Sequence, residues 1–217
     1  MAKYQAVIFD FDGTLVDSGP GIVLALRLML EEMGHKPMSD AELRACVGPP
    51  IHKFFPEVFG FEGETLTRAV EAYRRIFEEK AVPMLRAYPG VKEMLAAVRR
   101  ANMPTGVATC KLQHTCEEQA ETLGLLPHLD FISGADPEKG LLEKEDILQA
   151  LLDRTGFDPE RCVMVGDRMF DMIGAQAVRM PAIGVLYGVG SKEELSAYNP
   201  LYLPQSVEEL QALLLSE

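Results

Sequence analysis

The sequence is poor in the residues that build disulfide frameworks and zinc sites. Its 217 residues include four cysteines without a CxxC pair and four histidines without HxH or HExxH spacing. Cysteines spaced in this way are typical of reduced thiols in a cytoplasmic protein. We therefore expect neither a disulfide scaffold nor a zinc centre, and we expect a cytoplasmic location.

Long apolar segments are also missing. The longest apolar runs, such as residues 22–26, are far too short to span a bilayer. Met1 leads directly into a strand-like segment, without the basic region, apolar stretch and small-residue cleavage site of a secretory signal. The sequence therefore predicts neither a membrane span nor a secretory leader.

Positive charge is scarce. The chain has 21 Lys and Arg against 33 Asp and Glu, which gives a formal net charge of −12. Nucleic acids and anionic membranes both require a basic binding surface, so neither is an expected partner. The excess of carboxylates serves solubility, and carboxylates gathered at one site would need a cation.

Several nucleotide-binding and hydrolase motifs do not occur. No GxxxxGK[ST] segment is present, which excludes a P-loop, and no GxSxG elbow is present for a serine hydrolase. The glycines at 188 and 190 lack the third glycine of a dinucleotide fingerprint and follow the wrong strand.

What is present is an alternation of short apolar runs and helical stretches. Strand-like runs occur at 4–9, 105–109, 131–133, 162–165 and 182–185, and helical stretches at 91–100, 117–123, 144–154 and 172–178. Strand and helix in alternation predict a parallel sheet that is covered on both faces. The expected fold class is α/β.

The stretch 19–82 departs from this pattern because it is helical without a strand. Residues 22–33 form an apolar helix that ends at Gly34, Ser39 and Glu42 form a capping-box pair, and 65–80 is amphipathic. We interpret the stretch as a helical cap over the sheet edge. The predicted domains are a core of 1–18 and 83–217 and a cap of 19–82.

The strongest chemical signal is the segment Asp10-Phe11-Asp12-Gly13-Thr14, directly after the first strand. At the C-terminal end of a parallel strand a carboxylate faces the ligand crevice of the sheet. Two carboxylates two residues apart suit a divalent cation and a reacting phosphate: one attacks and the other exchanges protons. The alternative is that such a pair only caps a turn.

Gly166 and Asp167, followed by Asp171, repeat this arrangement after the strand at 162–165. Carboxylates from the two strand ends would repel one another without Mg²⁺. The alternative for Asp167 is a helix N-cap. Thr109 ends a third strand and offers a hydroxyl to a phosphate, and Lys144 begins the helix at 144–154.

Taken in order, these residues resemble the four motifs of the haloacid dehalogenase-like hydrolase superfamily. The helical insert is similar to the cap of its phosphoglycolate phosphatase and β-phosphoglucomutase branch. The resemblance covers essentially the whole chain. It implies a Rossmann-like doubly wound parallel sheet with an inserted α-helical cap, and a Mg²⁺-dependent phosphatase of small phosphorylated metabolites that is a monomer or homodimer.

The resemblance also implies roles for single residues. Asp10 would be the nucleophile and Asp12 the general acid and base. Mg²⁺ would be held by Asp10, the backbone carbonyl of Asp12 and Asp167, with Asp171 as a ligand or directly behind one. Thr109 and Lys144 would hold the transferring phosphoryl group. The neighbours expected at the phosphate site are Gly13, Thr14, Cys110 and Lys111.

The sequence departs from the family pattern at Cys110, where serine or asparagine is usual. Lys139 is an alternative to Lys144. We prefer Lys144, because Lys-x-x-Ile at a helix start is the commoner form. In the cap, the candidates for substrate contact are Arg44, Gly48, Pro49, His52, Lys53 and Arg74, with 48–50 as a lid loop that faces the site. The alternative for each charged residue is a solvated helix face.

Other functions compete with a phosphatase. A phosphomutase of the β-phosphoglucomutase type would share the aspartyl-phosphate but pass the phosphoryl group to a sugar hydroxyl. A phosphorylatable signalling domain uses a similar acidic cluster but lacks a long helical insert after its first strand. An inactive binding module would have lost motif residues, and this chain has all of them. The substrate stays open among phosphoglycolate, a sugar phosphate and a nucleoside monophosphate.

Overall fold

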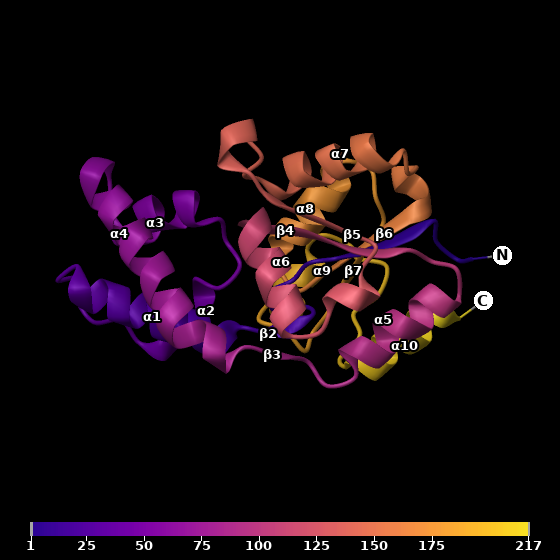
Figure 1. The fold of residues 1–217 in the computed structure, drawn as a ribbon, viewed down its shortest axis with the longest axis horizontal. Helices are drawn as coiled ribbons and strands as arrows, with labels where there is room; N and C mark the ends of the chain where they lie inside the picture. The colour runs from indigo at the N-terminus through magenta and orange to yellow at the C-terminus, as the bar shows by residue number, and fades with distance from the viewer. Residues whose placement is uncertain (1, 217) are drawn as a thin grey trace.

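The computed structural model describes residues 2–216. A five-stranded sheet lies on one side of the molecule, and helices from the first part of the chain lie on the other (Figure 1). The strand order is β5-β4-β1-β6-β7, and every pairing in this sheet is parallel. The strands are β1 (Ala6–Phe9), β4 (Thr105–Leu112), β5 (Phe131–Ala135), β6 (Cys162–Gly166) and β7 (Ala182–Gly184). The predicted α/β class is confirmed.

Helices cover both faces of the sheet, which explains why its strands are apolar throughout. Val7 and Phe9 of β1 pack in one apolar cluster with side chains of α5, α6 and α10. Ala6 and Ile8 pack in a second cluster with α7 and α8. The helices are α5 (Val91–Arg100), α6 (Gln113–Thr122), α7 (Lys144–Thr155), α8 (Met169–Ala177), α9 (Lys192–Ser196) and α10 (Val207–Leu215).

Helix α5 has the predicted bounds, whereas α6 and α8 begin earlier than their apolar periodicity indicates. At α8 the cause is a capping contact that the periodicity does not reveal. The amide of Arg168 donates to Asp171 Oδ2 at 3.1 Å, so the helix begins at Met169. At α6 the first residues are polar, and they do not carry an apolar stripe that would mark the start.

Four helices follow one another between residues 19 and 76 with no strand between them. They are α1 (Gly19–Glu32), α2 (Asp40–Ala45), α3 (Ile51–Phe59) and α4 (Gly63–Ile76). The capping box is present: the Ser39 amide donates to Glu42 Oε2 at 2.7 Å, and the Glu42 amide donates to Ser39 Oγ at 3.3 Å. We call this group the cap and the rest the core; the division at 18/19 and 82/83 stays a prediction.

Helix α3 is not among the elements predicted from the sequence, which placed a lid loop at 48–50. Pro50 directly precedes this helix, and Phe54, Phe55 and Phe59 bury their rings against one another. The Phe54 and Phe55 centroids lie 4.8 Å apart. The helix predicted over 65–80 ends at Ile76 and continues as a π-helical turn (Phe77–Ala81) and a 3₁₀ turn (Val82–Met84).

A two-stranded ribbon joins cap and core. Strands β2 (Val16–Asp17) and β3 (Arg86–Ala87) pair antiparallel, with Val16 opposite Ala87. The amide of Tyr88 also donates to the carbonyl of Leu15 at 3.0 Å. The two passages of the chain between cap and core therefore lie side by side, and we refer to β2 and β3 as the hinge. Figure 1 shows them between the cap helices and the sheet.

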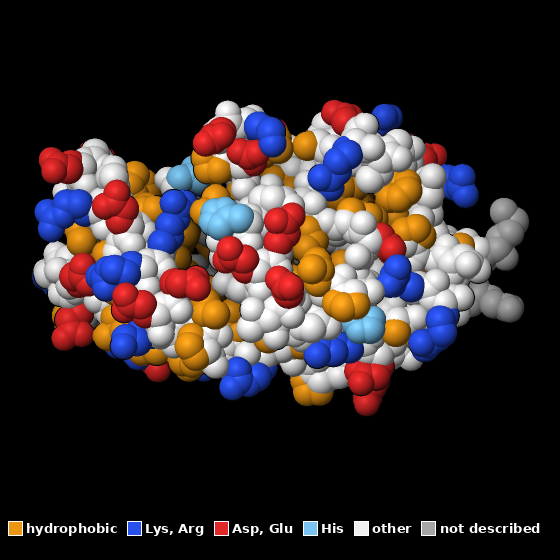
Figure 2. Space-filling model, in the orientation of Figure 1, with side chains coloured by type: hydrophobic (Ala, Val, Ile, Leu, Met, Phe, Trp, Pro, Cys, Tyr) orange, Lys and Arg blue, Asp and Glu red, His pale blue; other side chains and the backbone are white. Residues whose placement is uncertain are grey.

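The surface agrees with the composition. On the face shown in Figure 2, acidic side chains are interspersed with basic ones, and no continuous basic patch covers that face. Among residues 2–216, no helix combines the length and the apolarity that a membrane span requires.

Gly174 of α8 lies where α8 meets α7, and a Cβ there would lie 2.5 Å from Lys144 Cγ and 2.8 Å from its Cβ. We expect Gly174→Ala to lower the free energy of unfolding by about 1–3 kcal/mol, because α7 must shift to admit the methyl group. Gly19→Ala is the matched control, since its Cβ has no atom nearer than 3.9 Å. Urea denaturation measures both, and equal stability of the two variants would contradict this role of Gly174 in packing.

Candidate active site

The loops that follow three neighbouring strands meet at one edge of the sheet. Phe9 of β1 pairs with Val107 of β4 on one side and with Val165 of β6 on the other. Because the strands are parallel, the residues that follow them, among them Asp10 and Asp167, emerge at the same edge. In Figure 1 the cap lies beyond this edge, and both termini lie at the opposite end of the molecule.

Three carboxylates converge there. Asp10, Asp167 and Asp171 each offer one oxygen, and these oxygens lie within 4.8 Å of one another. The side chains are buried, with residue exposures of 9%, 1% and 1%. Carboxylates so close together and so far from water repel one another unless cations compensate their charge. We refer to these three residues as the acidic cluster.

Lys144 supplies one such cation. Its Nζ lies 2.8 Å from Asp10 Oδ1, 2.8 Å from Asp171 Oδ1 and 2.8 Å from the carbonyl oxygen of Ala108. The ammonium group therefore lies among two carboxylates and a carbonyl oxygen. Lys139 is exposed and pairs with Asp136 at 2.7 Å. Of the two lysines that the sequence left open, Lys144 is the one in the site.

Burial dominates the electrostatics of the cluster. Desolvation raises the pKa of Asp10 to about 6, with Lys144 opposing the shift and Asp171 adding to it. Desolvation and the charges of Asp171 and Asp10 raise the pKa of Asp167 well above its usual value. Burial alone would lower the pKa of Lys144, but the neighbouring Asp10 and Asp171 raise it. One ammonium group thus compensates the cluster only in part.

Asp167 contacts no lysine or arginine at ion-pair distance among residues 2–216. Its Oδ2 accepts from the Val189 amide at 2.8 Å, and the Thr14 hydroxyl lies 3.4 Å from its Oδ1. Gly13 makes room for it: φ is +79°, and a Cβ there would lie 2.2 Å from Asp167 Oδ2. Any other residue at 13 would displace the carboxylate from the cluster.

Asp12 is not part of the acidic cluster. Its two-residue spacing from Asp10 had suggested that its carboxylate would join those of Asp10, Asp167 and Asp171. Its carboxylate pairs with Lys111 Nζ at 2.9 Å. The same ammonium group donates to Gln119 Oε1 at 2.6 Å and lies 5.2 Å from the ring centroids of Phe11 and Phe77. Gln119 and Phe77 carry no sequence signal for this site, since α6 and the cap bring them in only on folding.

Thr109 is 2% exposed, and its Oγ1 accepts from the Lys111 amide at 3.3 Å. The next residue, Cys110, replaces the serine or asparagine that is usual in the family. Burial raises the pKa of its thiol to about 12. The thiol is therefore protonated at neutral pH and is not a nucleophile.

The cap candidates separate into two groups. His52 Nε2 lies 2.9 Å from Glu143 Oε1 and Lys53 Nζ lies 2.7 Å from Glu143 Oε2, which joins α3 to the residue before Lys144. Arg44 and Arg74 are exposed and form no ion pair among residues 2–216. The remaining cap residues expected near substrate were Gly48, which is exposed, and Pro49, which is half-buried.

The structure adds Arg168, which was not among the residues singled out from the sequence. A Cβ at Gly48 would lie 2.8 Å from its Cγ, so the arginine packs directly under the cap. Its Nε donates to Glu194 Oε1 at 2.9 Å, whereas Nη1 is buried without a partner among residues 2–216. A guanidinium beside Asp167 with a free donor offers a contact to a bound anion.

Known proteins are similar to this chain. Residues 7–185 match the haloacid dehalogenase-like hydrolase family. The chain belongs to that family. In this haloacid dehalogenase-like hydrolase, the assignment of motif roles to Asp10, Thr109, Lys144 and Asp167 stays a prediction.

Individual relatives support this assignment. The chain is 32% identical over 212 residues to a 5'-nucleotidase of Pseudomonas aeruginosa, covering 98% of this chain and 96% of that protein. It is 31% identical over 218 residues to a phosphoglycolate phosphatase of Neisseria meningitidis, covering 95% and 92%. The crystal structure of a predicted phosphatase from Clostridium acetobutylicum superposes with a TM-score of 0.93 at 33% identity, covering 99% of each chain. Together with the family, these relatives indicate a phosphoric monoester hydrolase.

The raised pKa values predict how the hydrolase responds to pH without metal. A carboxyl with a folded-state pKa above its unfolded value binds more protons when folded, so stability is lost as pH rises from about 4 through the raised pKa. We expect metal-free protein to lose stability as pH rises from 4 to 8, and Asp167→Asn to be about 1–3 kcal/mol more stable than wild type at pH 8.

Chemical denaturation in EDTA at several pH values measures this effect. Asp153→Asn, at an exposed position on α7, is the control and should follow the wild-type curve. A metal-free Asp167→Asn protein that is less stable than wild type at pH 8 would show that the carboxylate is compensated within the folded chain.

Proposed function

We propose that this hydrolase is a Mg²⁺-dependent phosphatase that passes the phosphoryl group of a small metabolite through Asp10. The observation that carries the proposal is the position of Asp10, which lies between the Lys144 ammonium group and two further buried carboxylates. Phosphoryl transfer needs alignment and compensation of charge more than elaborate covalent chemistry. This arrangement offers both.

The donor set fits a hard divalent cation. Mg²⁺ prefers oxygen ligands, and the acidic cluster offers three carboxylates whose charge Lys144 compensates only in part. Asp10, Asp167 and the backbone carbonyl of Asp12 would hold the ion, with Asp171 as a further ligand or directly behind one. The ion would supply positive charge against the oxygens of the transferring phosphoryl group.

Lys144 prepares Asp10 for attack. Its Nζ holds Asp10 Oδ1 at 2.8 Å, which favours the ionised carboxylate and fixes its orientation. In the first step an Asp10 oxygen bonds to phosphorus while the bond from phosphorus to the ester oxygen breaks. Lys144, at the start of α7, and the Thr109 hydroxyl, within β4 rather than at the strand end expected from the sequence, could hold phosphoryl oxygens during this step.

Asp12 acts as the general acid in the first step and as the general base in the second. It gives a proton to the departing ester oxygen, which leaves as an alcohol. It then takes a proton from water as the water oxygen bonds to phosphorus and the bond from phosphorus to Asp10 breaks. Inorganic phosphate and free Asp10 result. The contact between Asp12 and Lys111 at 2.9 Å supports this role, because it holds the carboxylate beside the cluster rather than within it.

The substrate class is a small phosphate monoester. One relative is named a 5'-nucleotidase and another a phosphoglycolate phosphatase. Nucleotides and phosphoglycolate are therefore candidate substrates, together with sugar phosphates. The contacts of His52 and Lys53 with Glu143 support closure of the cap over the site, which would limit substrate size. Purified protein with Mg²⁺ and a panel of phosphorylated metabolites tests the proposal; isomer formation from a hexose 1-phosphate without phosphate release would replace it by a mutase.

Removal of the nucleophile should stop the reaction. We expect Asp10→Asn to reduce Mg²⁺-dependent release of phosphate from p-nitrophenyl phosphate by about 10³-fold or more. The amide cannot form the acyl phosphate, whereas Asp153→Asn, on the exposed side of α7, should retain full turnover. Substantial activity of the Asp10 variant would exclude it as nucleophile.

Loss of the general acid should depend on the leaving group. We expect Asp12→Asn to lower kcat/KM for an alkyl ester, 2-phosphoglycolate, by about 10²–10⁴-fold. The loss on p-nitrophenyl phosphate should be at least about tenfold smaller, because p-nitrophenolate departs without a proton. The parameter kcat/KM reports the steps through formation of the phospho-aspartate. An equal loss on both esters would argue that Asp12 only supports the fold.

A further inference from the structure

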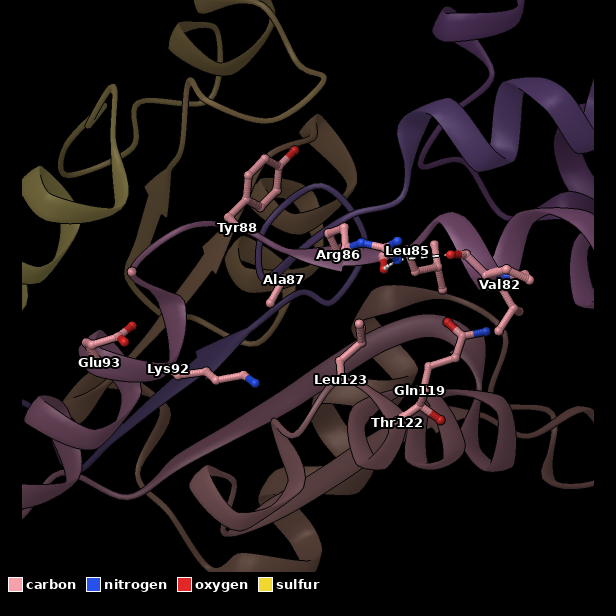
Figure 3. Close-up of a pocket in the computed structure, with 12 residues that line it drawn as sticks. Val82, Leu85, Arg86, Ala87, Tyr88, Lys92, Glu93, Gln119, Thr122 and Leu123 are labelled. Atoms are coloured by element: carbon pink, nitrogen blue, oxygen red, sulfur yellow. Dashed lines mark hydrogen bonds between the residues drawn. The ribbon is translucent and has the colours of Figure 1, made fainter.

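A cavity lies beside the hinge, apart from the acidic cluster. Its volume is about 570 Å³, within the range of small-molecule sites. Figure 3 shows it between the hinge strand β3, the start of α5 and the end of α6. Its main lining residues are Leu85, Ala87, Tyr88, Lys92, Gln119 and Leu123. None of Asp10, Asp12, Asp167 or Asp171 lines it.

Gln119 connects this cavity to the site of the reaction. It is 4% exposed, and its Oε1 accepts from Lys111 Nζ at 2.6 Å. A lysine ammonium group only donates, so the amide oxygen must face Lys111 and the amide nitrogen must face the other way. That nitrogen, Nε2, is buried and has no hydrogen-bond partner among residues 2–216. A buried donor without a partner is unfavourable, so the Gln119 amide is held in the fold through its oxygen alone.

The charged residues of the cavity favour an anion. Lys92 extends across it from α5 (Figure 3), and a Cβ at Gly124, just beyond α6, would lie 3.0 Å from its Nζ. Arg86 donates only to the carbonyl oxygens of Pro83 and Leu85. Neither cation has a carboxylate partner among residues 2–216. Glu93 is the one acidic residue in the lining, and it lies next to Lys92 in Figure 3.

We infer that the cavity binds a small organic anion, a carboxylate with an apolar body, and that its occupancy changes turnover at Asp12. The ligand carboxylate meets Lys92, and the apolar body lies against Leu85 and Leu123. The effect reaches the reaction through two contacts, from Gln119 to Lys111 and from Lys111 to Asp12. The binding claim is independent of the proposed function, whereas the effect on turnover rests on it.

The hinge gives the ligand a second way to act. Leu85 and Ala87 belong to the segment by which the chain returns from cap to core, and Phe77, just before it, lies over Lys111. A ligand that orders this segment biases how the cap sits over the core. Lys111 therefore receives both influences, one from the cavity through Gln119 and one from the cap through Phe77.

Binding is tested first without turnover. The probe is 3-(4-fluorophenyl)propanoate, observed by fluorine NMR with the metal-free protein and again with excess inorganic phosphate. We expect saturable binding that phosphate does not displace. We expect Lys92→Glu to weaken it about tenfold or more, since a charge-assisted contact is lost. Leu123→Trp should also weaken binding, because the indole occupies the space where the apolar body of the probe would lie.

Two control variants test whether the probe binds in this cavity and not elsewhere on the protein. Lys36→Glu makes the same charge change at an exposed cap position outside the cavity and should bind the probe as wild type does. Asp10→Asn should also bind the probe, even though its turnover is lost. Displacement of the probe by phosphate, an absence of binding, or unchanged affinity in both cavity variants would overturn the site.

The effect on turnover is measured separately, on 2-phosphoglycolate with Mg²⁺. We expect saturating probe to change kcat by about twofold or more in wild type. In Gln119→Leu the probe should still bind, but the change in kcat should be about half of that in wild type or less, because the contact to Lys111 is gone and only the route through the hinge remains. An equal response in both proteins would overturn the path through Gln119, and an unaffected wild-type kcat would reduce the cavity to a binding site without control of the reaction. If the wild-type protein without probe released no phosphate at all, that result would instead count against the proposed function.

Discussion

The ammonium group of Lys144 holds the acidic edge of the sheet together. It contacts Asp10 after β1, Asp171 in the first turn of α8 and the carbonyl of Ala108 in β4, each at 2.8 Å, and so joins three segments through one charge. Without it, three buried carboxylates would lie together with no lysine or arginine of residues 2–216 at ion-pair distance. The charge that remains uncompensated is what the proposed divalent cation would neutralise.

The packing around the cluster follows from this constraint. Gly174 lets α8 approach the stem of Lys144, and Gly13 lets the first loop approach Asp167. Apolar strands covered on both faces keep water from the strands that carry these residues. The buried carboxylates of the acidic cluster therefore lie beyond the strands, where the parallel sheet opens toward the cap. Stability and chemistry use the same few positions.

The cap communicates with the core through a small number of contacts. Glu143 receives His52 and Lys53 from α3 and directly precedes Lys144. Phe77 lies over Lys111, which pairs with Asp12. Lys144 and Asp12, which both take part in the proposed reaction, thus each have a neighbouring residue that contacts the cap. This arrangement gives a physical route by which substrate enclosure and proton transfer could be coupled.

The sequence alone determined the α/β class, the helical insertion and the residues of the acidic cluster. It could do so because strand ends in a parallel sheet share one edge, so a carboxylate after each apolar run implies convergence. It could not determine that Asp12 turns to Lys111, that Lys144 rather than Lys139 enters the site, or that Gln119 lies behind them. Those outcomes depend on side-chain directions and on helix positions that are set by packing between segments far apart in the chain, and such packing leaves no local pattern.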